Sequence, residues 1–402
     1  MTKSTKKLEV VGSQGSYLGE LIHAAVRKAI EAAVELELEE ALGAGSYERQ
    51  EGRKGYRHGS KTRTLTAHTG ATELDVPRGR MVGPNGKEHE WQSTLVPRYA
   101  RRLPEINEAV VGVYLSGGNT RRIRGALAPL LKNAPLSKSA VSRVLATLKE
   151  QWEEWKKASL RNLDVAYIFF DGIALPIRSG GKVARLPVLA AMGVMSDGSK
   201  RLLALEFCAS ESSESWKTFI DGLISRGLRA PKLCVIDGNA GLHNAISLAW
   251  QRSKIQRCTV HKLRNITAKV PKHAQTEVAD DYHKIVYAKT KTTALEAAKS
   301  FVKKWKARCP NAVASLQEAG DDLLTFFDFP AEQWKSIRST NTIERLNEEF
   351  RRRVKTQASL PNENAAVILL FSLIASGQIT LRKIDGFNKL PDVLEHDLAT
   401  AA

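Results

Sequence analysis

Val165-Ala-Tyr-Ile-Phe-Phe170 is a continuous apolar run that ends in the pair Asp171-Gly172. An unbroken apolar run of this length is typical of a strand buried on both faces of a sheet. The same pattern recurs at Lys232-Leu-Cys-Val-Ile236, which is followed by Asp237-Gly238. The sequence therefore predicts two buried strands, each with an aspartate at its C-terminal end, where α/β sheets usually place ligands.

The segments around these strands predict an α/β fold with a mixed sheet. Ser196-Asp197-Gly198-Ser199 has the composition of a hairpin turn. After residue 262 the chain becomes helical, charged and alanine-rich up to about residue 327, which predicts a helical insertion within the fold. The other predicted elements are the strands 186–195 and 201–208, the helices 213–227 and 241–251, and the strand 255–261.

The stretch Ser339-Thr-Asn-Thr-Ile-Glu344-Arg345-Leu-Asn-Glu348-Glu349-Phe-Arg351-Arg352-Arg353 predicts a helix. Its apolar residues recur at helical spacing and place Glu344 and Arg351 along one edge, where an acid and a base suit a phosphate and its metal. Two alternatives stay open. Asn341 and Glu344 have the spacing of a capping box, in which Glu344 would only bind backbone donors. Glu348 and Glu349 are alternative functional carboxylates.

Three carboxylates that share a site, Asp171, Asp237 and Glu344, would repel one another and have raised pKa values unless a cation lies among them. Mg²⁺ fits, because it takes hard oxygen ligands and keeps water for substrate phosphates. Two ions about 3.5–4 Å apart would assist the displacement of a phosphodiester, and we expect Mn²⁺ to substitute. The alternative for each aspartate is an ordinary Asp-Gly turn. The order strand-Asp, strand-Asp, helix-Glu over a mixed sheet is that of a ribonuclease H-like core.

Four segments carry a resemblance to a known family. They are Phe170-Asp171-Gly172, Val235-Ile-Asp237-Gly-Asn-Ala-Gly241-Leu242, Gln256-Arg-Cys258-Thr-Val-His261-Lys-Leu-Arg264-Asn265 and Thr340-Asn341-Thr-Ile-Glu344-Arg345-Leu-Asn347-x-Glu349-x-Arg351-Arg352-Arg353. Together, over about residues 55–376, they resemble the Mutator-type transposases of bacterial insertion sequences. The resemblance implies a DDE transposase with a ribonuclease H-like core and an all-helical insertion between the second aspartate and the glutamate.

The resemblance also implies roles for individual residues. Asp171, Asp237 and Glu344 would be the metal-binding catalytic triad, and Arg351 would contact DNA near the reacting end. Further contacts to DNA are expected from two neighbours on the same helix, Arg345 and Arg352.

Cys258 and His261 match the C-x2-H signature of the family, which the resemblance ties to activity. From the residues alone, two ligands cannot complete a zinc site, and a cysteine on an apolar strand is more often part of the core. His261 would orient a phosphate or a triad carboxylate.

The first hundred residues predict a helix, a basic loop and a small β element. Residues 17–42 predict one long amphipathic helix ended by Gly43, for packing or dimerisation. A loop of glycines and cations follows, and then two short strands, 62–66 and 73–76, around Gly70. The loop is either a DNA contact or a solvated surface. The cations expected to contact DNA here are Arg53, Lys54, Arg57, Arg78 and Arg80.

Residues 105–116, 119–131 and 136–148 predict three helices, with a turn at 133–135. Ser137 or Ser139 would cap the third helix. The pattern matches a helix-turn-helix whose last helix enters the major groove with Ser139 and Arg143, although any three-helix bundle gives a similar pattern. A charged helix at 151–159 would link this region to the α/β core.

The composition favours a polyanionic partner. Lys and Arg number 61 against 43 Asp and Glu, a formal charge of +18 over 402 residues, which points most simply to nucleic acid. The four cysteines include no C-x-x-C pair, so neither a disulfide framework nor a zinc ribbon is expected. With no signal peptide and no membrane-spanning run, we expect a cytoplasmic, nucleoid-associated bacterial protein without membrane contact.

We therefore expect a transposase that binds the terminal inverted repeats of its element, cuts there in a metal-dependent step and joins the end to target DNA. Because two ends must meet, a homodimer or larger assembly is expected. The alternatives are a ribonuclease H-like nuclease without joining activity and a transposase-derived DNA-binding protein. The predicted segments are 1–60 (helix and basic loop), 61–100 (small β element), 101–158 (helix-turn-helix region), 159–262 (core), 263–335 (helical insertion), 336–385 (core with the Glu344 helix) and 386–402 (tail).

Overall fold

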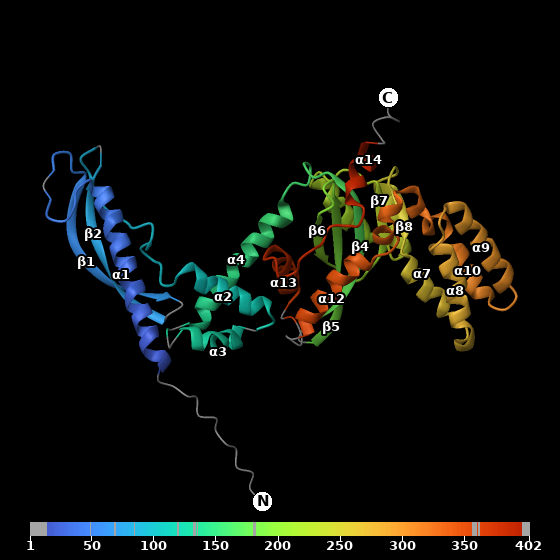
Figure 1. The fold of residues 1–402 in the computed structure, drawn as a ribbon, viewed down its shortest axis with the longest axis horizontal. Helices are drawn as coiled ribbons and strands as arrows, with labels where there is room; N and C mark the ends of the chain where they lie inside the picture. The colour runs from blue at the N-terminus through green and yellow to red at the C-terminus, as the bar shows by residue number, and fades with distance from the viewer. Residues whose placement is uncertain are drawn as a thin grey trace, which may run out of the picture. The chain divides into compact units, whose positions relative to one another are not determined.

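The computed structural model describes residues 14–395, apart from residues 49, 68–69, 84, 119, 132–133, 135, 180–181, 356–359 and 361. Most of the predicted turn at 133–135 and the end of the predicted tail lie outside the described residues. The backbone divides into two compact units, Met1–Ala146 and Thr147–Ala402 (Figure 1). Among the described helices, none has the length and apolar character needed to cross a bilayer.

The first unit begins with α1 (Gln14–Leu42), which packs against a three-stranded antiparallel sheet. Gly43 adopts a φ of +70°, which glycine reaches without strain, and it ends the helix as predicted. Val34 of α1 shares a small apolar core with Leu65 and Leu74 of the sheet. Both predicted strands are longer than expected, because their pairing runs back to Gly55. The strands are β1 (Gly55–Ala67), β2 (Gly70–Val82) and β3 (Glu88–Glu90).

Three helices follow along the chain, the last of which continues past Ala146 into the second unit: α2 (Pro104–Leu115), α3 (Thr120–Leu131) and α4 (Lys138–Lys157). Apolar residues of all three, such as Val110, Ile123 and Val144, form one core. Ser137 is the cap of α4, since its hydroxyl accepts a hydrogen bond from the Ala140 N–H at 3.1 Å. The predicted third helix and the predicted linker helix are a single helix.

The second unit is built on a mixed five-stranded sheet in the order β6-β5-β4-β7-β8. The pairs β4–β5 and β5–β6 are antiparallel, whereas β4–β7 and β7–β8 are parallel. The predicted α/β class and the hairpin at Gly198 are confirmed; the Met195 N–H donates to Ser199 O at 2.8 Å across that turn. The strands are β4 (Val165–Ser179), β5 (Lys182–Met195), β6 (Lys200–Phe207), β7 (Leu233–Ile236) and β8 (Lys254–Arg257).

Helices cover both faces of this sheet (Figure 1). On one face, residues of α5 (Ser213–Ser225) and α6 (Ala240–Ala249) pack with Ile168 and Phe170 of β4. Because strand side chains alternate, Asp171 points to the other face. That face meets α12 (Asn341–Lys355) and α13 (Glu363–Ala375).

Helices and their connections make up the whole of residues 259–337. The α-helices are α7 (Thr259–Thr267), α8 (Gln275–Val286), α9 (Lys291–Trp305), α10 (Pro310–Glu318) and α11 (Trp334–Ile337). Four 3-10 turns lie between them, η1 (Lys272–Ala274), η2 (Gly320–Leu323), η3 (Thr325–Asp328) and η4 (Ala331–Gln333). A buried carboxylate joins two of the helices, because Asp281 of α8 accepts bonds from Lys304 at 2.6 Å and Trp305 at 3.0 Å.

Three local predictions were wrong. Asp171 does not end its strand, because β4 continues to Ser179 by pairing with β5. The strand predicted at 255–261 ends at Arg257, because Cys258 caps α7 and accepts the His261 N–H. The described part of the predicted tail, residues 386–395, forms η5 (Phe387–Lys389) and α14 (Leu390–Glu395), where Leu390 is fully buried.

Candidate active site

Asp171 and Asp237 occupy matched positions on neighbouring parallel strands. The last register pair between β4 and β7 joins Phe169 to Val235, so each aspartate lies two residues beyond that pair. Neighbouring strands are about 4.8 Å apart, and the charge of Asp237 acts on Asp171. The structure therefore brings the two predicted aspartates together where the parallel pairing ends, even though β4 itself continues.

Asp171 is held by hydrogen bonds in a largely enclosed position. Asn347 of α12 donates from Nδ2 to Asp171 Oδ2 at 2.6 Å, and the Gly172 N–H donates to Oδ1 at 2.9 Å. Burial, and after it repulsion from Asp237, raises the pKa of Asp171 to about 6. A cation beside the pair would favour the charged form of this carboxyl.

A further carboxylate, Glu211, lies beside the aspartates and was missed by the sequence prediction. A Cβ placed on Gly172 would come within 2.9 Å of Glu211 Oε2, so the glycine leaves the room that this carboxylate occupies. Asn239 connects the two acids: its side chain donates to Glu211 at 3.3 Å and its N–H donates to Asp237 at 2.9 Å. Burial, followed by the charge of Asp237, raises the pKa of Glu211. A single glutamate in a loop before α5 belongs to no sequence pattern that would have revealed it.

Glu344 lies in the first turn of α12, and Thr340 immediately precedes this helix. The Thr340 hydroxyl donates to Glu344 Oε1 at 2.9 Å. His261 Nδ1 and Arg264 Nη2 lie 3.5 and 3.9 Å from the same carboxylate. These three partners of the Glu344 carboxylate are side chains, whereas the capping box considered from the sequence would have it bind backbone donors.

The two alternative glutamates of α12 have other surroundings. Glu348 is exposed to solvent. Glu349 pairs with Arg352 at 2.5 Å. Of the three, Glu344 is the one that contacts His261.

His261 links the groups of the site. A hydrogen bond with Cys258, followed by the charges of Cys258, Glu344 and Asp237, raises the pKa of His261. The imidazole also acts on Asp171. Burial alone would raise the pKa of the Cys258 thiol. Hydrogen bonds from His261 and Thr340 outweigh this effect, so the pKa lies below its ordinary value. Of the three predicted carboxylates, Glu344 lies 3.5 Å from the imidazole, whereas Asp171 and Asp237 act on it through their charges.

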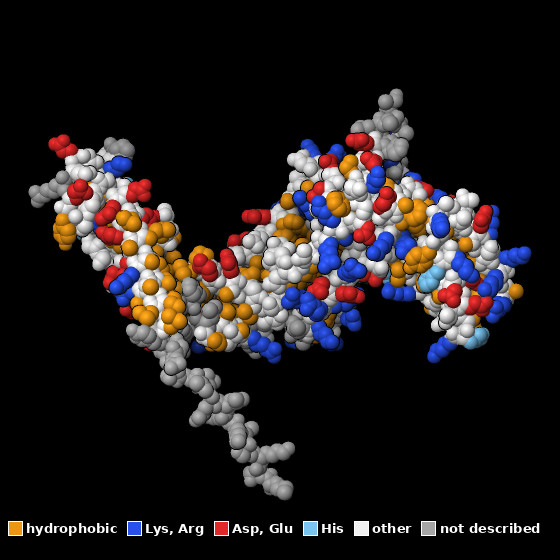
Figure 2. Space-filling view, viewed as in Figure 1, with side chains coloured by type: hydrophobic (Ala, Val, Ile, Leu, Met, Phe, Trp, Pro, Cys, Tyr) orange, Lys and Arg blue, Asp and Glu red, His pale blue; other side chains and the backbone are white. Residues whose placement is uncertain are grey.

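α12 presents cations next to Glu344. Arg345, Arg351 and Arg352 are all exposed. Figure 2 shows Lys and Arg side chains gathered over the region of the second unit where α12 lies in Figure 1. These arginines can therefore meet an anionic partner in solution.

The other residues predicted to contact DNA lie in the first unit and fall into two groups. Ion pairs hold three of them on the protein: Arg57 with Glu35 and Glu39, Arg78 with Glu90, and Arg80 with Glu88. The remaining four are exposed, namely Arg53, Lys54, Ser139 and Arg143.

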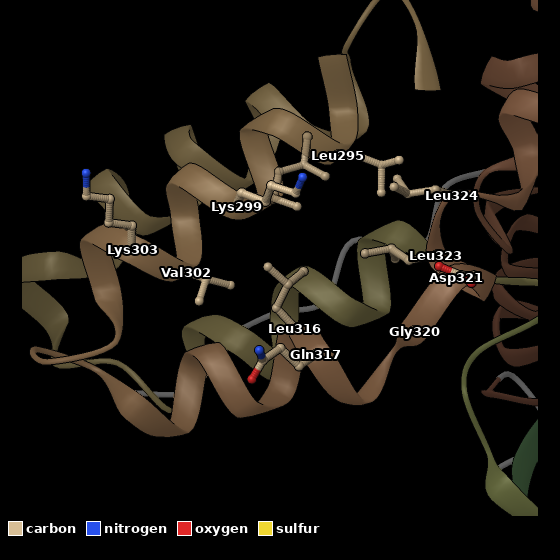
Figure 3. A pocket seen from close by; sticks show the side chains of 12 residues that line it. Leu295, Lys299, Val302, Lys303, Leu316, Gln317, Gly320, Asp321, Leu323 and Leu324 are labelled. Atoms are coloured by element: carbon tan, nitrogen blue, oxygen red, sulfur yellow. The ribbon is translucent and has the colours of Figure 1, made fainter. Parts of the chain in front are cut away.

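A separate groove of about 430 Å³ lies between α9 and α10 (Figure 3). Leu295, Val302 and Leu316 make its apolar lining, and Lys299 and Lys303 lie along it. No residue predicted for the active site lines this groove, so it is not part of the candidate site.

The family model for the transposases of the Mutator family matches residues 1–380. The match covers nearly the whole chain, so the protein belongs to this family of transposases. The resemblance seen in the sequence motifs is thereby confirmed.

Named relatives agree with this assignment. The chain is 30% identical to the transposase for insertion sequence element IS905 of Lactococcus lactis subsp. lactis, over 98% of this chain and 99% of the relative. It is 30% identical to the transposase for insertion sequence element ISRM5 of Rhizobium meliloti, over 98% and 96%. Among solved structures it matches the Drosophila P element transposase strand transfer complex at 12% identity, over 74% of this chain and 85% of that one, with a TM-score of 0.29.

Proposed function

We propose that this transposase is a DDE enzyme whose catalytic triad is Asp171, Asp237 and Glu344. The observation that carries the proposal is the matched position of the two aspartates on adjacent parallel strands, with Asn347 binding Asp171 to the helix that bears Glu344. The interaction of His261 with all three carboxylates supports a single shared site.

The sheet is consistent with a ribonuclease H-like core. Its three antiparallel strands are followed by two parallel ones, and helices cover both faces. Between β8 and α12 the chain is helical, with η2 and η3 lying against β8, and these helices would be the all-helical insertion.

The candidate residues fit Mg²⁺ as the metal. Asp171, Asp237 and Glu344 offer hard oxygen ligands, and burial, followed by the charge of Asp237, raises the pKa of Asp171. When bound there as two ions, Mg²⁺ would activate the attacking oxygen and stabilise the leaving oxygen of a phosphodiester displacement, a role that Mn²⁺ also fills.

The protein's own groups would bind and orient the DNA. Arg345 and Arg351 would neutralise phosphates beside the triad, and Arg352 would do so by exchanging its exposed ion pair with Glu349 for a phosphate. In the first unit, the exposed Arg53 and Lys54 and the start of α4, with Ser139 and Arg143, would bind the terminal inverted repeats. Target DNA would enter next to the α12 arginines. Arg57, Arg78 and Arg80 would act indirectly, because their ion pairs fix the surface from which neighbouring groups reach DNA.

The surface of α1 supports a homodimer. Six exposed apolar residues follow the alternating spacing of four and three residues that is typical of a coiled-coil seam. The opposite side of the helix buries Val34, Leu38 and Leu42 within its own unit. The seam consists of Leu18, Ile22, Ala25, Ala29, Ala32 and Leu36. A second copy of α1 would cover this seam and bring two element ends together.

The proposal is tested by incubating the full chain with labelled DNA that carries the terminal repeat of its own element, in Mg²⁺ or in EDTA. We expect metal-dependent cleavage and joining by the wild type. Asp171→Asn, Asp237→Asn and Glu344→Gln should each abolish both reactions while binding to repeat DNA stays nearly intact. The control is Asp221→Asn, which removes an exposed carboxylate of α5.

The products distinguish the rival functions. Retained cleavage by any of the three variants removes that residue from the triad. Hydrolysis without joining would identify a nuclease. Tight repeat binding without cleavage, in the presence of two DNA ends, would identify a DNA-binding protein.

A further inference from the structure

One buried hydroxyl contacts both members of the C-x2-H motif and the proposed catalytic glutamate. Thr340 Oγ1 lies 3.2 Å from Cys258 Sγ, 3.3 Å from His261 Nδ1 and 2.9 Å from Glu344 Oε1. Thr340 is fully buried. The three partners come from α12 itself, from α7 and from the residue that precedes α7.

The hydrogen-bonding capacity of a hydroxyl suits these three partners. A hydroxyl has one proton and two acceptor sites. A carboxylate only accepts and is a stronger acceptor than a thiol, so the Thr340 proton is directed at Glu344. An N–H at His261 Nδ1 can then donate to the Thr340 oxygen, and Cys258 Sγ, which accepts the N–H groups of His261 and Thr340, lies against the same hydroxyl. Glu344 is held in one orientation as a result.

Cys258 also ties together the backbone segments that carry the triad. Its N–H donates to Ile236 O at 2.7 Å, one residue before Asp237. Its sulfur accepts the Thr340 N–H at 3.3 Å. The cysteine therefore fixes the start of the Glu344 helix relative to the strand end that carries Asp237.

We propose that the C-x2-H motif positions the catalytic glutamate through Thr340. Cys258 and His261 hold the Thr340 hydroxyl, and that hydroxyl orients the Glu344 carboxylate toward the metal. This inference rests on the proposed role of Glu344. Because Cys258, His261 and Glu344 offer ligand atoms within 4.8 Å of one another, a zinc ion is the competing explanation. The hydrogen bonds of Thr340 account for this closeness without an ion.

The test compares Thr340→Val, which keeps the shape and removes the hydroxyl, with Thr340→Ser, which keeps the hydroxyl. Calorimetry gives the dissociation constant for Mn²⁺, and cleavage of terminal-repeat DNA gives the Mg²⁺ concentration for half-maximal rate. Loss of an outer-shell partner weakens metal binding or activity about 10–100-fold. We expect Thr340→Val to raise both constants at least about tenfold, and Thr340→Ser to restore both to within about threefold. Cys258→Ala should likewise raise both metal constants, and Cys258→Ser should raise them less.

The matched control is Thr290→Val, which removes the N-cap hydroxyl of α9. It should cost about 1 kcal/mol of stability and leave both metal constants unchanged. Wild-type metal constants in a folded Thr340→Val protein would overturn the inference. The inference would also be overturned if the purified wild type contained one zinc ion per chain and Cys258→Ser contained none. Wild-type Mn²⁺ affinity in Asp171→Asn would instead overturn the carboxylate site, and the inference with it.

Discussion

Asn347 Nδ2 lies 2.6 Å from Asp171 Oδ2, and this hydrogen bond joins two residues that are 176 positions apart in the chain. Asn347 is 1% exposed, and its Oδ1 has no hydrogen-bond partner among the described residues. The buried amide is thus committed to the aspartate. This contact sets the helix that carries Glu344 against the strand that carries Asp171.

Asn347→Asp should move the acidic limit of cleavage upward. The substitution replaces a donor to Asp171 with a second buried carboxyl, and like charges at this distance raise the pKa of a carboxyl. At a fixed Mg²⁺ concentration, the pH of half-maximal cleavage should rise by about one unit or more. Asn362→Asp is the matched control, since Asn362 caps α13 and aspartate caps equally well. An unchanged pH profile would show that Asn347 does not act on the triad.

Wild-type cleavage should fall as the pH drops through about 6, because the protonated form of Asp171 does not bind a cation. Raising the Mg²⁺ concentration should shift this fall to lower pH, since metal and proton compete for one carboxylate. The measurement is the initial cleavage rate between pH 5 and 8 at two Mg²⁺ concentrations. A midpoint that does not respond to Mg²⁺ would assign the titration to another group.

Asp171→Asn should stabilise the metal-free protein at neutral pH. The pKa of Asp171 in the folded state, about 6, lies above its ordinary value of 3.8. The folded state therefore binds more protons than the unfolded state within this window, and stability is lost as the pH rises through it. Asparagine removes this cost, which predicts a gain of about 1–3 kcal/mol at pH 7.5 and none below pH 4.

The gain is measured by denaturant unfolding in EDTA, with Asp221→Asn as the matched surface control. Since Asp221 is exposed and paired with Lys217, its replacement should change stability little at either pH. Destabilisation of Asp171→Asn at pH 7.5 would contradict the prediction.

Arg351→Ala should weaken DNA binding and cleavage moderately. Arg351 is exposed and lies two helical turns beyond Glu344 on one helix edge. Loss of one phosphate contact should reduce the slope of log affinity against log salt by about one. Arg252→Ala is the control, because Arg252 precedes β8, at the end of the strand away from the triad. Equal salt slopes for the two variants would make Arg351 an ordinary surface charge.

Leu18→Glu and Leu36→Glu should dissociate the proposed dimer. The two leucines are 63% and 64% exposed within their own chain, so a charge there costs little in a monomer. A buried leucine contributes about 1.5–3 kcal/mol, so each change should raise the dimer dissociation constant at least about tenfold. Light scattering should find wild-type particles of about twice 44.3 kDa. Leu248→Glu, at a site 73% exposed on α6, should leave the mass unchanged.

Local patterns were enough to predict the strands and most helices. The apolar run before Asp171 can be stable only when buried, and Gly198 marks a turn whichever fold surrounds it. Cys258 was misplaced, because the end of a four-residue strand depends on the helix cap that replaces it and not on periodicity. The tail was misjudged for a related reason: Leu390 is buried only because distant elements cover it.

The sequence by itself determined the α/β class and the family and proposed three carboxylates as candidates, since these depend on short-range periodicity and on motifs within single segments. Only the tertiary structure brought Asn347 to Asp171, Thr340 to Cys258 and Glu211 to Gly172. Each of these contacts joins segments that are far apart in the chain. Such pairs leave no local pattern, because their distance is set by how strands and helices pack and not by neighbouring residues.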